Sequence, residues 1–186
     1  MLVYFTASIA GKKKFLPFYT KIIEYLKARH HEVISDHIIE SSEQALQDEE
    51  RNERLKFHEK LEHWINTCDF VIAEASYPSI SVGYEISLAL HRGKPLLLLY
   101  AGDQPPTLLA HHKNENLVCE HYTPETLPQI IDEFIHYVEG AEDTRFTFFI
   151  TTAIAAYLED VSRKEKTPKS VYLRKLIEAD MRRKIS

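Results

Sequence analysis

Residues 77–86 (Tyr-Pro-Ser-Ile-Ser-Val-Gly-Tyr-Glu-Ile) place a carboxylate near hydroxyl groups at a predicted helix start. Ser79 and Ser81 supply the hydroxyls, and we predict Ser81 as the helix N-cap. Glu85 lies in the first turns, where the helix dipole favours an ionised carboxylate, and Gly83 allows a ligand to approach closely. A helix N-terminus with hydroxyls also suits an anion. The segment is therefore either a ligand site or an ordinary capped helix.

Other residues that can do chemistry give weaker patterns. The lysines at 12–14 form either a solvated turn or a source of positive charge for a phosphate. Cys68 and Cys119 match no metal-ligand spacing and cannot form a disulfide framework, so we expect buried, reduced thiols in a cytoplasmic protein. The histidine pairs at 30–31 and 111–112 lack a third ligand nearby in the sequence. We expect no metal and no cofactor.

The elements that must position these residues alternate between strands and helices. We predict strands at 2–6, 32–35, 68–74, 95–100 and 117–119. Helices are expected after Pro17, which suits a first helical turn, and at 42–67, 82–91 and 124–138. This alternation predicts an α/β fold with a parallel sheet between helices, in which ligands bind beyond the carboxyl ends of the strands. Two loops are expected there, at 6–12 and 75–82.

Composition and charge divide the chain into two parts. The 186 residues are 44% hydrophobic and 27% charged, which is typical of a globular protein, and no apolar run is long enough to cross a membrane. The first apolar residues are followed, not preceded, by lysines, which is the wrong order for a secretory signal. Residues 1–143 carry a net charge of −10 and residues 144–186 one of +5. We predict one domain at 1–139 and a second at 144–186.

Motifs in the first domain resemble the nucleoside 2-deoxyribosyltransferase superfamily, and among its members the 2′-deoxynucleoside 5′-phosphate N-hydrolases. The resemblance runs in register from residue 2 to about residue 100, and more loosely to 138. The matching pieces are Val3-Tyr-Phe-Thr-Ala-Ser-Ile, Asp36-His37, Trp64, Ala73-Glu, Pro78-Ser-Ile-Ser-Val-Gly-Tyr-Glu85 and Gly93-Lys-Pro. It implies a flavodoxin-like fold, usually as a dimer with sites near the interface.

The resemblance also implies a chemistry. Members cleave the N-glycosidic bond of deoxynucleosides or deoxynucleotides through a glutamate nucleophile, with the logic of a retaining glycosidase. By position Glu85 matches the nucleophile and Tyr4 the tyrosine that orients it. Ser8 and Ser79 match hydroxyls that contact phosphate, and His37 matches a residue that lines the site. The full set of candidate substrate-binding or phosphate-binding residues is Ser8, Ile9, Gly11, His37, Ser79, Ser81 and Gly83.

Three positions depart from the family pattern. The aspartate that serves as acid or base is Leu61 here, and a leucine cannot donate a proton. His58 and Glu62 lie on the same helix, and either is a candidate substitute. The phosphate-binding arginine is Ala10, and a loop glycine is Ser81. The loss of an acid typically costs about 10²–10⁴-fold in rate.

The C-terminal segment resembles a ribbon-helix-helix module, with a strand at 145–150 and helices at 153–164 and 171–181. Such modules pair two chains, and known members insert the paired strands into the DNA major groove. Arg145 and Thr147 would face outward there, and Lys169 and Ser170 would contact phosphate at a helix start. Phe149 would also face outward and is a poor reader of bases, which favours a homodimer or higher oligomer over DNA binding.

Two functions from different classes fit these observations. The first is an N-glycosidase or deoxyribosyltransferase-like enzyme with a nucleoside or nucleotide ligand and Glu85 as nucleophile. The alternative is a non-catalytic, nucleotide-binding regulator whose C-terminal segment binds DNA or fixes a dimer. Intact Tyr4, Ser79 and Glu85 favour the enzyme, whereas Leu61 favours the regulator.

Overall fold

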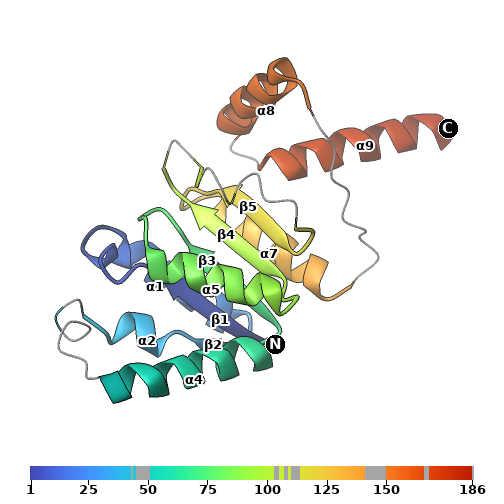
Figure 1. The fold of residues 1–186 in the computed structure, drawn as a ribbon. Coiled ribbons are helices and arrows are strands. Elements are labelled where there is room, and N and C mark those ends of the chain that lie inside the picture. Colours follow the sequence, from blue (N-terminus) through green and yellow to red (C-terminus); the bar gives the residue numbers. More distant parts are fainter. Residues whose placement is uncertain are drawn as a thin grey trace. The chain divides into compact units, whose positions relative to one another are not determined.

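Short apolar runs form the strands of a parallel sheet in the computed structural model, which describes residues 1–42, 44, 51–102, 105–106, 109, 114–140, 150–165 and 168–185. The strands are β1 (Leu2–Ala7), β2 (Glu32–Ile34), β3 (Phe70–Glu74), β4 (Leu96–Tyr100) and β5 (Leu117–His121). Their order is β2-β1-β3-β4-β5, and every neighbouring pair is parallel. This is the flavodoxin-like order, so the predicted fold class is confirmed (Figure 1).

The helices of this sheet unit follow from the same alternation. They are α1 (Lys12–Ala28), the short α2 (Asp36–Ile39), α4 (Arg51–Thr67) and α5 (Ile80–His91). In Figure 1, α4 and α5 lie in front of the sheet and α1 lies behind it. The strand order reverses direction between β1 and β3, and a ligand site is expected at the carboxyl ends of these two strands.

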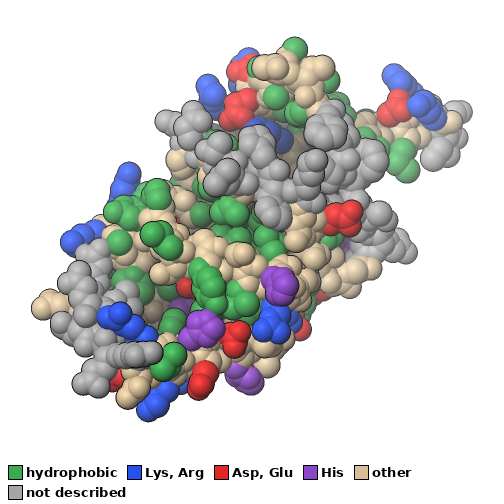
Figure 2. Space-filling model, in the orientation of Figure 1, with side chains coloured by type: hydrophobic (Ala, Val, Ile, Leu, Met, Phe, Trp, Pro, Cys, Tyr) green, Lys and Arg blue, Asp and Glu red, His purple; other side chains and the backbone are tan. Residues whose placement is uncertain are grey.

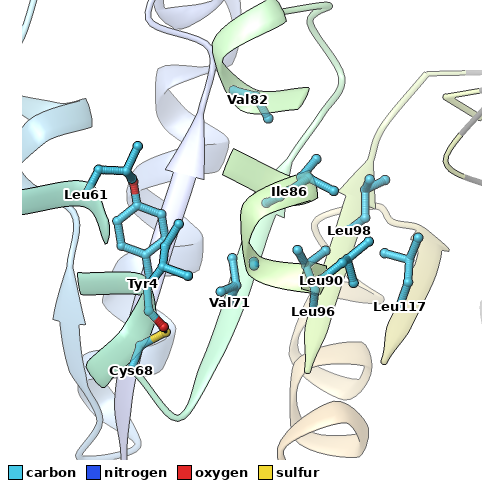
Figure 3. Close-up of a cluster of buried hydrophobic side chains, with 13 residues drawn as sticks. Tyr4, Leu61, Cys68, Val71, Val82, Ile86, Leu90, Leu96, Leu98 and Leu117 are labelled. Atoms are coloured by element: carbon cyan, nitrogen blue, oxygen red, sulfur yellow. The ribbon is translucent and has the colours of Figure 1, made fainter. Parts of the chain in front are cut away.

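The three central strands, β1, β3 and β4, bury both of their faces. On the α4 and α5 side a cluster joins Tyr4, Val71 and Leu96 of the sheet to Leu61 and Ile86 of the helices (Figure 3). On the other side the ring of Phe5 lies 6.0 Å from that of Tyr19 in α1. Full burial of one such aliphatic or aromatic side chain contributes about 1.5–3 kcal/mol, so the two apolar layers hold the strand ends in place.

Two helix starts differ from the predictions. α1 begins at Lys12, so Pro17 lies inside the helix and the predicted place of Pro17 in its first turn was wrong. α5 begins at Ile80, and its N-cap is Ser79, not Ser81. Ser79 has the extended backbone of an N-cap, and its Oγ accepts a hydrogen bond from the N–H of Val82 at 3.4 Å.

The described chain divides into two compact units, Met1–Tyr122 and Thr123–Ser186. The second contains α7 (Leu127–Val138), α8 (Thr152–Glu165) and α9 (Lys169–Ile185). Leu158 of α8 and Val171 of α9 are buried, and the hydroxyls of Tyr157 and Tyr172 lie 3.0 Å apart. The domain boundaries at 139 and 144 stay a prediction, and the strand predicted at 145–150 falls, except for Ile150, outside the described residues.

None of the helices formed by the described residues is both long and apolar enough to cross a bilayer. On the face shown in Figure 2, charged and histidine side chains gather over α4, which is the helix nearest the bottom of that view.

Candidate active site

Glu85 is a buried carboxylate held by a tyrosine from the neighbouring strand. Glu85 lies in the second turn of α5 and is 6% exposed. The hydroxyl of Tyr4, from the middle of β1, donates a hydrogen bond to Glu85 Oε2 at 2.9 Å. Because Tyr4 is fully buried, the sheet fixes the direction from which this donor reaches the carboxylate.

His37 occupies the other side of the same hydroxyl. Its Nε2 lies 2.9 Å from the Tyr4 oxygen, and the two rings stack with centroids 5.0 Å apart. A phenol has one proton, and Tyr4 gives it to Glu85, so His37 Nε2 must carry the hydrogen that points at Tyr4. This assignment leaves His37 Nδ1 as an acceptor. Nδ1 is buried and has no hydrogen-bond partner among the described residues.

Burial sets the protonation behaviour of these three groups. Burial raises the pKa of Glu85 above its ordinary value, while the nearby hydroxyls of Thr6 and Tyr4 act in the opposite direction. Burial also raises the pKa of Tyr4, with the Glu85 charge adding to the effect, so Tyr4 stays a donor at any working pH. Burial lowers the pKa of His37 to about 4, so its imidazole is neutral at pH 7.

A cavity of about 670 Å³ opens next to Glu85. That volume is in the range of small-molecule sites. Its walls come from the β1–α1 loop, α2, α4 and the start of α5. Its lining residues are Ala7, Ser8, Ile9, Ala10, Asp36, His37, Ile38, Glu40, Ser41, Phe57, Lys60, Trp64, Pro78, Ser79, Ser81, Val82 and Glu85.

One wall of the cavity is aromatic. The ring of Trp64 lies 5.1 Å from that of His37, 6.3 Å from that of Tyr4 and 6.0 Å from that of Phe57. Flat aromatic surfaces bind bases by stacking, at about 1–3 kcal/mol per base. The arrangement therefore combines a surface for a base with a buried carboxylate that can attack a sugar carbon.

Comparison with known proteins agrees with this geometry. No family model matches the sequence. A protein of Nematostella vectensis, named as a putative 2′-deoxynucleoside 5′-phosphate N-hydrolase 1, is 31% identical over 138 residues, which cover 71% of this chain and 92% of the relative. The chain belongs to the 2′-deoxynucleoside 5′-phosphate N-hydrolase family. The resemblance found in the sequence is thus confirmed.

Two further comparisons relate this N-hydrolase family member to a rat enzyme and to a solved structure. The rat 5-hydroxymethyl-dUMP N-hydrolase is 34% identical over 98 residues, which cover 53% of this chain and 60% of the rat protein. The chain therefore matches less than two thirds of that relative. The structure of a CMP N-glycosidase from Clostridium botulinum has the same fold, with a TM-score of 0.51 and 21% identity over 72% of this chain and 99% of that one.

Most of the site residues predicted from the family converge on the cavity. Its lining includes the predicted residues Ser8, Ile9, His37, Ser79, Ser81 and Glu85. Tyr4 stands behind Glu85. Gly11 supports the wall, because a Cβ there would lie 2.7 Å from Cβ of Tyr77. Gly83 lines a different groove, together with Ile86, and its predicted role in the close approach of a ligand stays a prediction.

The two candidate substitutes for the family's acid do not reach the cavity. Nε2 of His58 lies 2.7 Å from the Tyr84 hydroxyl at the surface, and Glu62 pairs with Arg92 at 3.5 Å. Leu61, which stands where the family has its aspartate, is 4% exposed and packs in the cluster that contains Tyr4 (Figure 3). The structure therefore leaves the acid position apolar.

Several cavity residues were missed by the sequence analysis. Asp36 and Trp64 entered only as matches to the family, and Glu40, Phe57 and Lys60 did not enter at all. A signal for one wall was present, because Phe57, Lys60 and Trp64 recur at spacings of three and four residues and so share one helix face. Glu40 carries no comparable pattern, since it follows a helix of only four residues.

The loop that delivers Ser79 and Ser81 is held by a second buried glutamate. Glu74, at the end of β3, accepts hydrogen bonds from the Tyr122 hydroxyl at 3.1 Å and from the N–H and hydroxyl of Ser76. Ser76 Oγ in turn accepts from the N–H of Ala101 at 2.8 Å. Burial raises the pKa of Glu74, against the effect of these donors. Glu74 lies on the α1 side of the sheet and does not line the cavity.

The predicted DNA contacts are only partly described. Arg145 and Thr147 lie outside the described residues. Lys169 forms an ion pair with Glu159, and the Ser170 hydroxyl donates to Glu133 at 3.4 Å. Both side chains therefore already face carboxylates of their own unit. Among the described residues, no three His, Cys, Asp or Glu side chains gather in a way that could hold a metal ion.

Proposed function

We propose that this chain cleaves the N-glycosidic bond of a deoxynucleoside or deoxynucleotide, with Glu85 as nucleophile. The observation that carries the proposal is the hydrogen bond from buried Tyr4 to Glu85 at the wall of a base-sized cavity. The tyrosine leaves Oε1 of the same carboxylate available for attack. The activities for which the relatives are named support the same reaction class.

The reaction follows two displacements. A Glu85 oxygen bonds to the anomeric carbon as the bond from that carbon to the base nitrogen breaks, and the bonding pair leaves with the base. Water then attacks the same carbon, gives up a proton, and returns Glu85 as a carboxylate with the sugar released. The free base takes up one proton overall. With Leu61 at the acid position, that proton comes from solvent in this proposal.

Tyr4 and His37 would tune the nucleophile and would not react themselves. The Tyr4 hydroxyl would keep Oε2 of Glu85 hydrogen-bonded and would stabilise the negative charge of this buried carboxylate. Neutral His37 fixes the rotation of that hydroxyl by giving it a hydrogen bond. Trp64 would hold the base against the cavity wall.

Base release tests this proposal directly. The protein is incubated with a panel of deoxynucleosides and their 5′-monophosphates, and free base is measured by chromatography. We expect release by the wild type and a loss of at least about 10³-fold in Glu85→Gln, because the amide cannot act as the nucleophile. Glu62→Gln is the matched control, since Glu62 lies outside the cavity, and it should retain full activity.

A second variant addresses the missing acid. Leu61→Asp should raise the rate of base release, because general acid catalysis needs a proton donor. Leu61→Asn should not raise it, because asparagine has the shape of aspartate but no acidic proton. If wild type and Leu61→Asp both release no base from any substrate, the chain is not a glycosidase. Retained ligand binding in Glu85→Gln would then favour the nucleotide-binding regulator.

For the C-terminal unit we propose pairing with a second copy of the chain and not DNA binding. Large apolar side chains of α8 and α9 are exposed, and they are Ile154, Tyr157, Leu176, Ile177 and Met181. Lys169 and Ser170 contact carboxylates, which leaves less positive charge for a phosphate at the start of α9. The two free thiols, Cys68 and Cys119, support a cytoplasmic location.

A further inference from the structure

The charges around the cavity are predominantly negative. Its lining contains the carboxylates of Asp36, Glu40 and Glu85, and a single cation, Lys60, among the residues that the structure describes there. His37 adds no charge at pH 7, because burial lowers its pKa to about 4.

The lysines that follow the β1 loop do not offset this charge. Lys12 donates hydrogen bonds from Nζ to the backbone carbonyls of Ile39 and Ser41, at 2.7 Å each. Its charge therefore connects the start of α1 to the end of α2. Neither Lys13 nor Lys14 lines the cavity. Ala10, which does line it, offers no donor in its side chain.

Some of the backbone donors near the cavity are also occupied. The N–H of Gly11 donates to Ser8 Oγ at 3.2 Å, and that of Lys12 donates to the carbonyl of Ile9. At the start of α5, the N–H groups of Val82 and Gly83 donate to Ser79. A helix start binds a phosphate through N–H groups of its first turn, and here the N–H of Val82 is already used by the Ser79 side chain.

We infer that the cavity takes an uncharged nucleoside in preference to its 5′-phosphate. This inference rests on the proposed function, because it concerns the substrate of the same site. A phosphate dianion would enter a space with a net negative charge, where close like charges oppose binding. A nucleoside brings only hydroxyls to that end of the cavity, and these can hydrogen-bond to Asp36, Glu40 and the serine hydroxyls.

Two measurements test the inference. The first is kcat/KM for base release from a deoxynucleoside and from its 5′-monophosphate with the same base. The second is the dissociation constant of the same two ligands for Glu85→Gln, measured by calorimetry, which needs no turnover. We expect the nucleoside to be favoured at least about tenfold in both.

Charge variants then test the cause. Ala10→Arg should shift the preference toward the monophosphate, whereas Ala10→Gln, which adds bulk without charge, should not. Asp36→Asn combined with Glu40→Gln should shift it in the same direction as the arginine. A wild type that prefers the monophosphate overturns the inference and leaves the proposed glycosidase function standing. Binding of neither ligand overturns both, whereas binding of the nucleoside without release of base supports the inference and overturns only the glycosidase.

Discussion

Tyr4 is the residue on which the site depends, because one hydroxyl serves two neighbours. It donates to Glu85 and receives a hydrogen bond from His37, both at 2.9 Å. The sequence predicted Glu85 from its place near a helix start, and the family resemblance predicted Tyr4 as its partner. Neither could predict Glu40, because it follows a helix of only four residues and belongs to no periodic pattern.

Glu85 should cost the folded protein stability at neutral pH. Burial raises its folded pKa, so the folded state holds the proton more tightly than the unfolded chain does. The contribution of Glu85 to stability is fully present below the pKa of the unfolded chain, about 4.3, and it is lost as pH rises through the pKa of the folded state. At pH 7 the burial of the ionised carboxylate lowers the free energy of unfolding. A glutamine at this position would avoid that loss, because it carries no charge at any pH.

Glu85→Gln should therefore unfold at higher urea than the wild type at pH 7, with a gain of roughly 0.5–2 kcal/mol, and the gain should vanish near pH 4. Glu62→Gln, at the surface, is the control and should change stability little at either pH. An equal gain at both pH values would show that ionisation of Glu85 is not the cause.

At the scale of the elements, the two glycines Gly11 and Gly83 have different surroundings. Gly11 ends the β1 loop, where a Cβ would lie 2.7 Å from Cβ of Tyr77 and 2.8 Å from the Tyr19 hydroxyl. Gly83 lies within α5, where a Cβ would meet no atom within 4 Å. The sequence predicted each strand of the sheet, but it misplaced the start of α1, because the N-cap Gly11 has no side chain that could signal a helix start.

Gly11→Ala should lower the free energy of unfolding by about 1–3 kcal/mol through overpacking, and it should lower base release because the loop lines the site. Gly83→Ala is the matched control and should raise the free energy of unfolding by about 0.5–1 kcal/mol, since alanine is the better helix former. Urea unfolding of both variants checks the pair. Equal effects would contradict the close packing at Gly11.

At the scale of the whole molecule, the two compact units carry different tasks in our proposals. Met1–Tyr122 holds the complete cavity, and Thr123–Ser186 holds the exposed apolar side chains of α8 and α9. The sequence predicted two domains from charge and from the change of pattern near residue 140, and the boundaries at 139 and 144 stay a prediction. It did not predict that contacts group α7 with the C-terminal helices, because the period of a helix does not reveal which neighbour it packs against.

Sedimentation velocity tests the proposed pairing. The wild type should sediment as a dimer or larger, and Ile177→Asp should shift it toward the monomer, because a charge cannot be buried in an apolar contact without a partner. Lys175→Asp, an exposed position on the same helix, is the control and should leave the dimer intact. A monomeric wild type, or tight and strongly salt-dependent binding to duplex DNA, would contradict the proposal.

The chain has a single tryptophan, and Trp64 lies in the cavity wall within 6.3 Å of the Tyr4 and His37 rings. The protein's tryptophan fluorescence therefore originates at the site itself. A nucleobase that stacks on the indole should quench this emission in proportion to occupancy, so that an unlabelled sample reports its own binding curve. Trp64→Phe, which keeps an aromatic surface, should abolish the signal while base release persists.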